Sequence, residues 1–174
     1  MNFIIMKKNL ILLGMMGVGK TTAGKIVARN LDLNFFDTDK LIEKEISMSV
    51  KEIFEKKGEK FFRKEEEKIA LKYIDKKNSV ITLGGGSFMN ENIKNKVLSE
   101  CLSIWLDLNV ENLSLRLAKD SRRPLLQKTN NLKTIQKIYN NRKNLYKLAN
   151  YRVDCNKLSV KQLVNKIVNI YADY

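Results

Sequence analysis

A glycine-rich run near the start of the chain carries the residues best suited to chemistry. Residues 14–21 read GMMGVGKT, which fits the pattern G-x-x-x-x-G-K-[S/T] between a segment of strand character and one of helical character. Glycines let successive backbone N–H groups turn inward around phosphate oxygens, and the following helix adds its positive dipole end. The run therefore predicts a nucleotide-phosphate site made by Gly14, Gly17, Val18, Gly19, Lys20, Thr21 and Thr22.

Two side chains of this run have distinct predicted roles. Lys20 is placed to bridge the β- and γ-phosphates, and the Thr21 hydroxyl is placed to coordinate the magnesium ion that shares those oxygens. The alternative is a glycine-rich turn with an unrelated lysine, which the strand before it and the helix after it make the weaker reading. The motif indicates ATP or GTP but does not identify the phosphate acceptor.

Two carboxylates follow the second segment of strand character. Asp37 and Asp39 belong to the run FFDTD, and residues two apart in an extended segment point to one face. Ligands of doubly wound sheets bind at such carboxyl ends of strands. We predict that one acid assists the metal and the other orients the acceptor hydroxyl or takes its proton. Capping of a helix that begins near Lys40 is the alternative.

Three consecutive glycines end another apolar segment. Gly84, Gly85 and Gly86 follow the run VITL, and the lack of side chains lets backbone amides approach a ligand closely. We predict that they lie under the transferred phosphate or the acceptor. A flexible connection between strand and helix is the alternative.

The elements that must position these residues alternate along the chain. Short apolar runs predict strands at 9–13, 34–36, 79–83, 102–106 and 152–154. Amphipathic segments predict helices at 20–31, 40–47, 49–57, 60–76, 91–98, 110–118, 132–150 and 160–171, with a capping box formed by Ser49 and Glu52. The alternation is typical of an α/β fold with three layers, in which a central five-stranded parallel sheet lies between helices.

The domain organisation is predicted to be simple. We find no repeat and no second domain boundary, so residues 1–174 are expected to form a single domain. Its substrate-binding helical region covers about 37–66. A mobile lid is predicted at about 117–131, around the polar interval 119–131 that holds the only proline.

Composition limits the partners and the compartment. The formal charge is +14, but the lysines are interleaved with Glu and Asn as on solvated helix faces, so we expect no nucleic-acid partner. No apolar run reaches the ~20 residues of a membrane span. Cys101 and Cys155 belong to no metal-like cluster and are expected to be free thiols of a cytoplasmic protein, neither of them catalytic.

In combination, these features resemble the shikimate kinase family, in the nucleoside-monophosphate-kinase branch of P-loop proteins. The resemblance covers nearly the whole chain and includes, besides the runs above, Ile53-Phe54, Gly58-Glu59, Phe62-Arg63-Lys64-Glu65-Glu66, Ile104-Trp105-Leu106-Asp107, Arg123-Pro124-Leu125-Leu126 and Arg142 with Tyr146. It implies an ATP-dependent, magnesium-requiring monomer that phosphorylates the 3-hydroxyl of shikimate, in the pathway to chorismate and the aromatic amino acids.

The resemblance also implies roles for individual residues. Asp37 would help to hold magnesium through water and Asp39 would contact the shikimate hydroxyls, while the glycines at 84–86 would line the substrate site. Arginines would bind the substrate carboxylate (Arg63 and Arg142), lie against adenine (Arg116) and close with the lid (Arg123). The implied catalytic residues are Asp39, Lys20 and Arg123.

The two carboxylate-binding arginines agree with simple chemistry. A planar guanidinium matches a carboxylate through two parallel hydrogen bonds, which lysine cannot offer. Without the resemblance, Arg63 and Arg142 read equally well as ordinary solvent-exposed charges of lysine-rich helices.

Two rival functions and three departures from the family pattern accompany this reading. A kinase of gluconate or of a nucleoside monophosphate would share the phosphate loop but not the combination of Asp39, the glycines at 84–86 and the two arginines. A nucleic-acid-binding P-loop module would fit the net charge, but there are no aromatic stacking runs beside the basic residues. The departures are Ser47, where Gly is common, Leu83, where Thr is frequent, and Lys147, where an acidic residue is often seen.

Overall fold

Five short strands form one parallel sheet in the computed structural model, which describes residues 8–118 and 132–174. The strands are β1 (Leu10–Leu13), β2 (Asn34–Asp37), β3 (Ser79–Thr82), β4 (Leu102–Asp107) and β5 (Tyr151–Asp154), in the order β2-β3-β1-β4-β5. Leu10 pairs with Val80 on one side and with Leu102 on the other. Every residue of β1, β3 and β4 is buried, as expected for strands covered on both faces.

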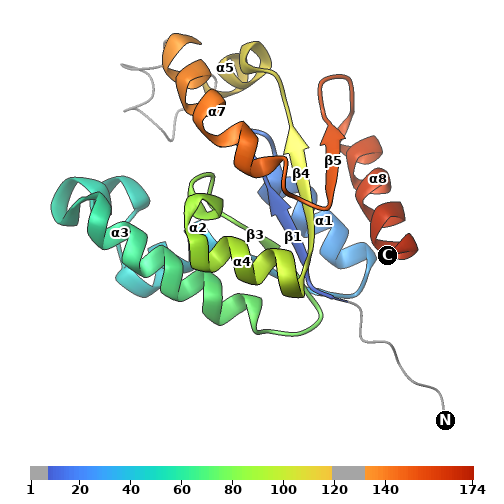
Figure 1. The fold of residues 1–174 in the computed structure, drawn as a ribbon, viewed down its shortest axis with the longest axis horizontal. Helices are drawn as coiled ribbons and strands as arrows, with labels where there is room; N and C mark the ends of the chain where they lie inside the picture. Colours follow the sequence, from blue (N-terminus) through green and yellow to red (C-terminus); the bar gives the residue numbers. More distant parts are fainter. Residues whose placement is uncertain (1–7, 119–131) are drawn as a thin grey trace.

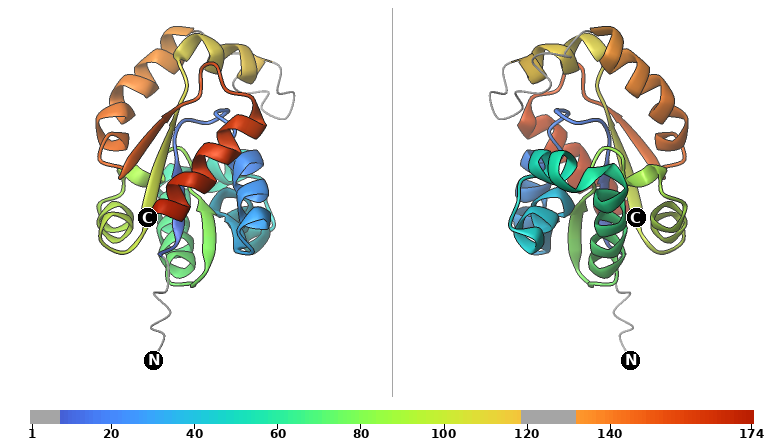
Figure 2. Two further views of the ribbon diagram at one scale, coloured as in Figure 1. Left: turned by 90° about the vertical axis from the view of Figure 1, so that its right-hand side faces the viewer. Right: turned by 90° about the vertical axis from the view of Figure 1, so that its left-hand side faces the viewer.

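Helices cover both faces of this sheet, which confirms the three-layer α/β/α prediction (Figures 1 and 2). Figure 2 shows α1 (Lys20–Asn30) and α8 (Val160–Asp173) on one side, and α4 (Glu91–Glu100) and α7 (Leu132–Tyr146) on the other. The remaining described helices are α2 (Thr38–Ile46), α3 (Val50–Ile74), α5 (Val110–Ala118) and the short 3-10 helix η1 (Ser87–Met89). α2 and α3 pack on each other around a small apolar cluster of their own, made by Ile42, Ile53, Phe62 and Ile69.

The parallel arrangement brings the segments with predicted chemistry to one edge of the sheet. The loop before α1 follows β1, Asp37 is the last residue of β2, and the glycines at 84–86 come just after β3. Because β2, β3 and β1 are neighbours, the carboxyl ends of these strands lie side by side. The order of the strands in the sheet therefore brings the three segments with predicted chemistry together.

Some predicted element boundaries differ from the structure. The helices predicted at 49–57 and 60–76 meet in α3 at a kink, because Gly58 has φ 82° and ψ 167°. The predicted capping box is confirmed, and the Ser49 backbone N–H and hydroxyl lower the pKa of the Glu52 carboxyl to about 2. α7 ends at Tyr146 rather than at 150, because the Asn150 side-chain oxygen accepts hydrogen bonds from the Ser103 N–H and hydroxyl, which directs the chain into β5.

Of the lid predicted at about 117–131, residues 117 and 118 are the end of α5, and the rest, with Arg123, lies outside the described residues. Among the helices that are described, none is both long enough and apolar enough to cross a membrane. The two cysteines are unpaired and buried. Burial raises the pKa of Cys101 to about 12 and that of Cys155 to about 11, so both remain protonated near neutral pH and lack the reactive thiolate.

The departure at Ser47 has a structural consequence. Ser47 ends α2 in the left-handed conformation, with φ 56° and ψ 33°, which glycine adopts without steric cost. Ser47→Gly is therefore expected to raise the free energy of unfolding by about 0.5–1 kcal/mol, or Tm by about 1–4 °C. Thermal unfolding measures this. The matched control is Ser49→Ala, which removes the cap of α3 and should lower stability by about 1 kcal/mol. A lower Tm for Ser47→Gly would contradict the assignment of strain.

Candidate active site

The loop between β1 and α1 has a backbone shaped to hold an anion. Gly14, Gly17 and Gly19 have φ values of 138°, 79° and 104°, which side-chain-bearing residues rarely adopt. Gly19 precedes α1 and has no side chain to cap the first N–H groups of that helix. These N–H groups and the helix dipole are available to a phosphate, in agreement with the motif.

The two reactive side chains of this loop are held by neighbours. The Lys20 Nζ donates to the carbonyl oxygens of Gly14 and Met15, at 2.8 and 3.0 Å. The Thr21 hydroxyl donates to Asp37 Oδ2 at 2.5 Å. Lys20 therefore lies against the loop whose phosphate it is predicted to bind, and Thr21 and Asp37 place two oxygen ligands together beside that loop.

Asp37 and Asp39 do not both project from an extended segment, so that part of the prediction is wrong. β2 ends at Asp37, and Asp39 already lies in the first turn of α2. The Asp37 Oδ1 accepts from the Lys40 N–H at 3.2 Å, so the capping alternative is correct for Asp37 while its other oxygen meets Thr21. Asp39 points elsewhere, because a Cβ built on Gly84 would lie only 2.6 Å from Asp39 Oδ1. Asp37 thus contacts Thr21 and the start of α2, whereas Asp39 lies against Gly84.

Three side chains from different helices reach the three successive glycines, which we call the glycine loop (84–86). Asp39 of α2 lies at Gly84, and a Cβ on Gly85 would be 3.1 Å from Arg142 NH1 of α7. A Cβ on Gly86 would be 2.6 Å from Arg63 NH1 of α3. The structure therefore brings Asp39, Arg63 and Arg142 together. A Cβ would overlap its neighbour at Gly84 and Gly86, and would make a tight contact at Gly85.

The glycine loop is fixed by hydrogen bonds, which argues against a merely flexible connection. The Thr38 hydroxyl donates to the Thr82 carbonyl at 3.3 Å and accepts from the Gly84 N–H at 3.1 Å. The Tyr146 hydroxyl donates to the Gly85 carbonyl at 2.5 Å. Burial raises the pKa of Tyr146 to about 12, so the phenol stays protonated and keeps donating near neutral pH.

Arg63 is oriented by two carboxylates on its own helix. Glu66, only 2% exposed, accepts from Arg63 NH1 at 2.7 Å and from the Ser87 hydroxyl at 2.7 Å. Glu59 accepts from Arg63 Nε and NH2, at 3.2 and 3.1 Å. Burial lowers the pKa of Arg63, but Glu66 and Glu59 outweigh it and raise the pKa above its ordinary value. The guanidinium is therefore charged and held in one orientation.

The sequence reasoning included Glu66 in the family run 62–66 but gave it no role, and it did not single out Ser87. A weak signal existed, because Glu66 stands three residues after Arg63 and so shares its helix face. Apart from the family run, the local charge pattern does not distinguish this glutamate from the exposed ones around it.

Arg142 has an unsatisfied donor. Its NH1 is buried and has no hydrogen-bond acceptor among residues 8–118 and 132–174. α7 itself is fixed, because Tyr139 donates to Asp107 Oδ1 at 2.9 Å and Asp107 also pairs with Arg152. A buried, unpaired N–H is costly, so the position of Arg142 favours an anion that binds at the glycine loop.

On the nucleotide side, Arg116 of α5 reaches the phosphate loop. Its NH1 donates to the Val18 carbonyl at 3.0 Å. Thr22 lies in the first turn of α1, exposed, and Val18 is buried. The predicted nucleotide residues that are described thus lie around one loop.

The oxygen pair of Thr21 and Asp37 fits the chemistry of a magnesium site. Mg²⁺ prefers hard oxygen ligands and usually keeps waters and nucleotide phosphates in its shell. Within the described residues there is no group of three or more His, Cys, Asp or Glu side chains that would hold a metal alone. One hydroxyl and one carboxylate beside a phosphate loop suit a metal that arrives with its nucleotide.

Comparisons with known proteins agree with this geometry. Residues 16–172 match the family model described as shikimate kinase. The chain is 39% identical to the shikimate kinase of Sulfurihydrogenibium sp. over 161 residues, which cover 92% of this chain and 96% of that protein. It is 42% identical to the Bacillus subtilis shikimate kinase over 167 residues, covering 94% and 89%.

Solved structures give the same result. The shikimate kinase from Acinetobacter baumannii in complex with shikimate superposes with a TM-score of 0.90 at 30% identity, covering 96% of this chain and 94% of that one. A gluconokinase from Sinorhizobium meliloti gives a TM-score of 0.57 at 10% identity, covering 97% and 93%, and shares the fold alone.

Proposed function

Because the chain belongs to the shikimate kinase family, we propose that it transfers the γ-phosphate of ATP to the 3-hydroxyl of shikimate, giving shikimate 3-phosphate and ADP. It is thus an ATP-dependent phosphotransferase with an alcohol acceptor, acting in the synthesis of chorismate and aromatic amino acids. The observation that carries the acceptor assignment is the convergence of Asp39, Arg63 and Arg142 on the glycine loop.

The phosphate loop binds the triphosphate of ATP. Backbone N–H groups of Gly14, Gly17, Val18 and Gly19, with the first turn of α1 including Thr22, surround the phosphate oxygens. Lys20 exchanges its two carbonyl partners for the β- and γ-phosphates. Arg116, already bonded to the loop at Val18, lies against adenine.

Magnesium is the metal that this site would use. Thr21 would hold it directly, and Asp37 through water, since the two oxygens already lie 2.5 Å apart. Bound there, Mg²⁺ would supply neutralisation of charge on the phosphate oxygens.

The acceptor lies on the glycine loop. Arg63 and Arg142 bind its carboxylate with planar hydrogen bonds, and the buried Arg142 NH1 gains the acceptor that it lacks. Glu66 holds Arg63 in place while this happens. Asp39 orients the 3-hydroxyl and takes its proton as the oxygen attacks the γ-phosphorus, while the Gly84, Gly85 and Gly86 backbone permits close approach.

Little covalent chemistry is required of the protein, because phosphoryl transfer depends mainly on positioning and charge stabilisation. Lys20 neutralises charge on the transferring group from the phosphate loop. Arg123, in the lid proposed for 117–131, also neutralises this charge, and closure of that lid excludes water.

The remaining features of the proposal concern the whole chain. Residues 1–174 act as a single domain, with substrate-binding helices at about 37–66, and the protein acts as a monomer in the cytoplasm. Neither nucleic acid nor membrane is a partner, which the even distribution of lysines among acidic and amide residues supports.

An acceptor assay tests the function. Purified protein with ATP and Mg²⁺ should release ADP at least about 100-fold faster with shikimate than with gluconate, a nucleoside monophosphate or no acceptor, because the two arginines and Asp39 together fit a carboxylate held at a fixed distance from the reacting hydroxyl. Gluconate is the informative control, since it also has a carboxylate and the fold is shared with a gluconokinase. Faster turnover with either alternative acceptor would overturn the shikimate assignment.

A further inference from the structure

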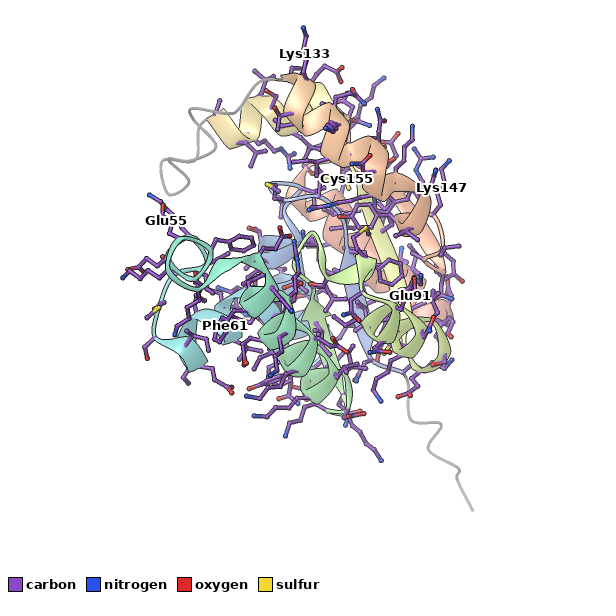
Figure 3. The ribbon with its side chains drawn as sticks, turned by 60° about the vertical axis from the view of Figure 1, so that its left-hand side comes forward. Glu55, Phe61, Glu91, Lys133, Lys147 and Cys155 are labelled. Carbon is purple, nitrogen blue, oxygen red and sulfur yellow. The ribbon has the colours of Figure 1, made fainter. Side chains whose placement is uncertain are left out.

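A groove lined by basic side chains runs along α3 and includes Arg63. It has a volume of about 610 Å³, and four of its lining residues are cationic: Lys57, Lys60, Arg63 and Lys64. Phe61, labelled in Figure 3, and Asn90 also line it. We call this the basic groove. It is large enough for a small organic anion.

The lysines of this groove differ from most other lysines of α3. The exception is Lys72, which also has no ion pair in the described part of the chain and lies over the Tyr73 ring. Lys51, Lys56 and Lys68 each have a carboxylate within 4 Å, at 3.8 Å from Glu55, 3.4 Å from Glu52 and 2.9 Å from Glu45, respectively. No ion pair joins Lys57, Lys60 or Lys64 to a carboxylate in the described part of the chain. All three are exposed. The lining of the groove therefore carries three positive charges that have no described carboxylate within 4 Å.

The one acid that lines the groove, Glu67, stays ionised, because hydrogen bonds from Asn92 and Asn90 lower its pKa, and it offsets only one of the four positive charges. Glu67 accepts hydrogen bonds from the side-chain amides of Asn90 and Asn92, at 3.0 and 2.6 Å. Arg63 has its own carboxylates, Glu59 and Glu66. The lining therefore keeps an excess of positive charge that comes from the three lysines.

The basic groove and the acceptor site share Arg63. The Arg63 guanidinium faces Gly86 of the glycine loop, while the same side chain lines the groove. Asn90, on the groove, follows Gly86 by one turn of 3-10 helix. An anion held in the groove is thus beside the site where the acceptor carboxylate binds.

We propose that the basic groove is a capture surface for small carboxylate anions, which concentrates the acceptor beside Arg63 before it binds at the glycine loop. This inference rests on the proposed function, since it takes shikimate to be the acceptor. Clefts lined by one sign of charge focus the electrostatic field and raise both the local concentration of an opposite ion and its association rate. Added salt screens such an effect.

The experiment compares two triple variants that each remove three positive charges. The groove variant removes the three positive charges that have no ion pair: Lys57→Gln/Lys60→Gln/Lys64→Gln. The control variant removes three exposed lysines from α1 and α8, on the face of the sheet opposite α4 and α7 (Figure 2): Lys25→Gln/Lys161→Gln/Lys166→Gln. At low ionic strength the groove variant should lose about 3- to 10-fold in kcat/KM for shikimate, with KM for ATP and kcat unchanged. The loss should shrink towards nothing near 0.5 M salt, at about a 4 Å screening length. The control should stay within about 2-fold throughout.

The outcomes separate the inference from the function on which it rests. An equal loss in both variants would assign the effect to net charge and overturn the capture surface. If the loss in the groove variant persisted at high salt, or came with a lower Tm, it would be caused by a change in local structure. That result would also overturn the capture surface. Failure of the proposed function would instead appear as absence of shikimate turnover in the unsubstituted protein. Lys64→Gln alone should show a smaller loss with the same salt dependence, which tests the inference if the triple variant does not fold.

Discussion

Asp39→Asn is expected to lower kcat with shikimate by about 10²- to 10⁴-fold, because the amide keeps the shape of the carboxylate but cannot accept the hydroxyl proton. Asp39 faces Gly84 of the glycine loop, and its proposed role is to take the hydroxyl proton rather than to bind phosphate. The affinity for ATP should therefore change by less than about 2-fold. Turnover is measured by ADP release at saturating shikimate, and affinity by equilibrium titration with nucleotide.

A matched control and two contrary outcomes make this prediction sharp. Asp173→Asn removes an exposed carboxylate at the end of α8 and should leave kcat unchanged. Ordinary turnover in Asp39→Asn would remove Asp39 from its role as proton acceptor. A large loss of nucleotide affinity with little change in kcat would move Asp39 to the metal side of the site, beside Asp37.

The parts of the fold and site that sequence predicted correctly are those in which backbone conformation dictates residue type. The phosphate loop needs positive φ at Gly14, Gly17 and Gly19, so its glycines are visible in the sequence. The glycine loop needs room for Asp39, Arg63 and Arg142, so three glycines in a row are visible too. The sheet followed from apolar runs that are buried on both faces.

The parts that sequence did not predict depend on side-chain contacts that hydrophobic periodicity does not reveal. Asp39 lies in a helix because Asp37 caps α2 two residues earlier, and the local pattern FFDTD fits extended and helical continuations equally. Glu66 is buried because Arg63 and Ser87 satisfy it, although its sequence neighbours are the charged residues of a solvent-exposed helix face. For Asp39 the deciding contact is local, because Asp37 caps the Lys40 N–H, and only the bond from Ser87 to Glu66 comes from outside the window that periodicity can read.

The same distinction explains the end of α7. Helical periodicity continues past Tyr146, but Asn150 bonds to Ser103, which is 47 residues away along the chain. α7 therefore stops where Tyr146 and Arg142 point at the glycine loop, and its length is set by the site and by β4 rather than by its own sequence.

Arg142→Lys is expected to raise KM for shikimate by about 30- to 100-fold, corresponding to about 2–3 kcal/mol, with KM for ATP unchanged. Arg142 NH1 is buried against Gly85 without an acceptor among the described residues, so the guanidinium offers a carboxylate a desolvated N–H in a fixed plane. Lysine keeps the charge but provides a single flexible ammonium group, and it cannot form the two parallel hydrogen bonds. Initial rates at varied shikimate and fixed saturating ATP give the KM.

Arg29→Lys, at an exposed position in the last turn of α1, is the control that should leave every constant unchanged. If Arg142→Lys lowered Tm but kept the KM for shikimate, the unpaired nitrogen would be a packing defect of α7, and the carboxylate would have to bind through Arg63 alone.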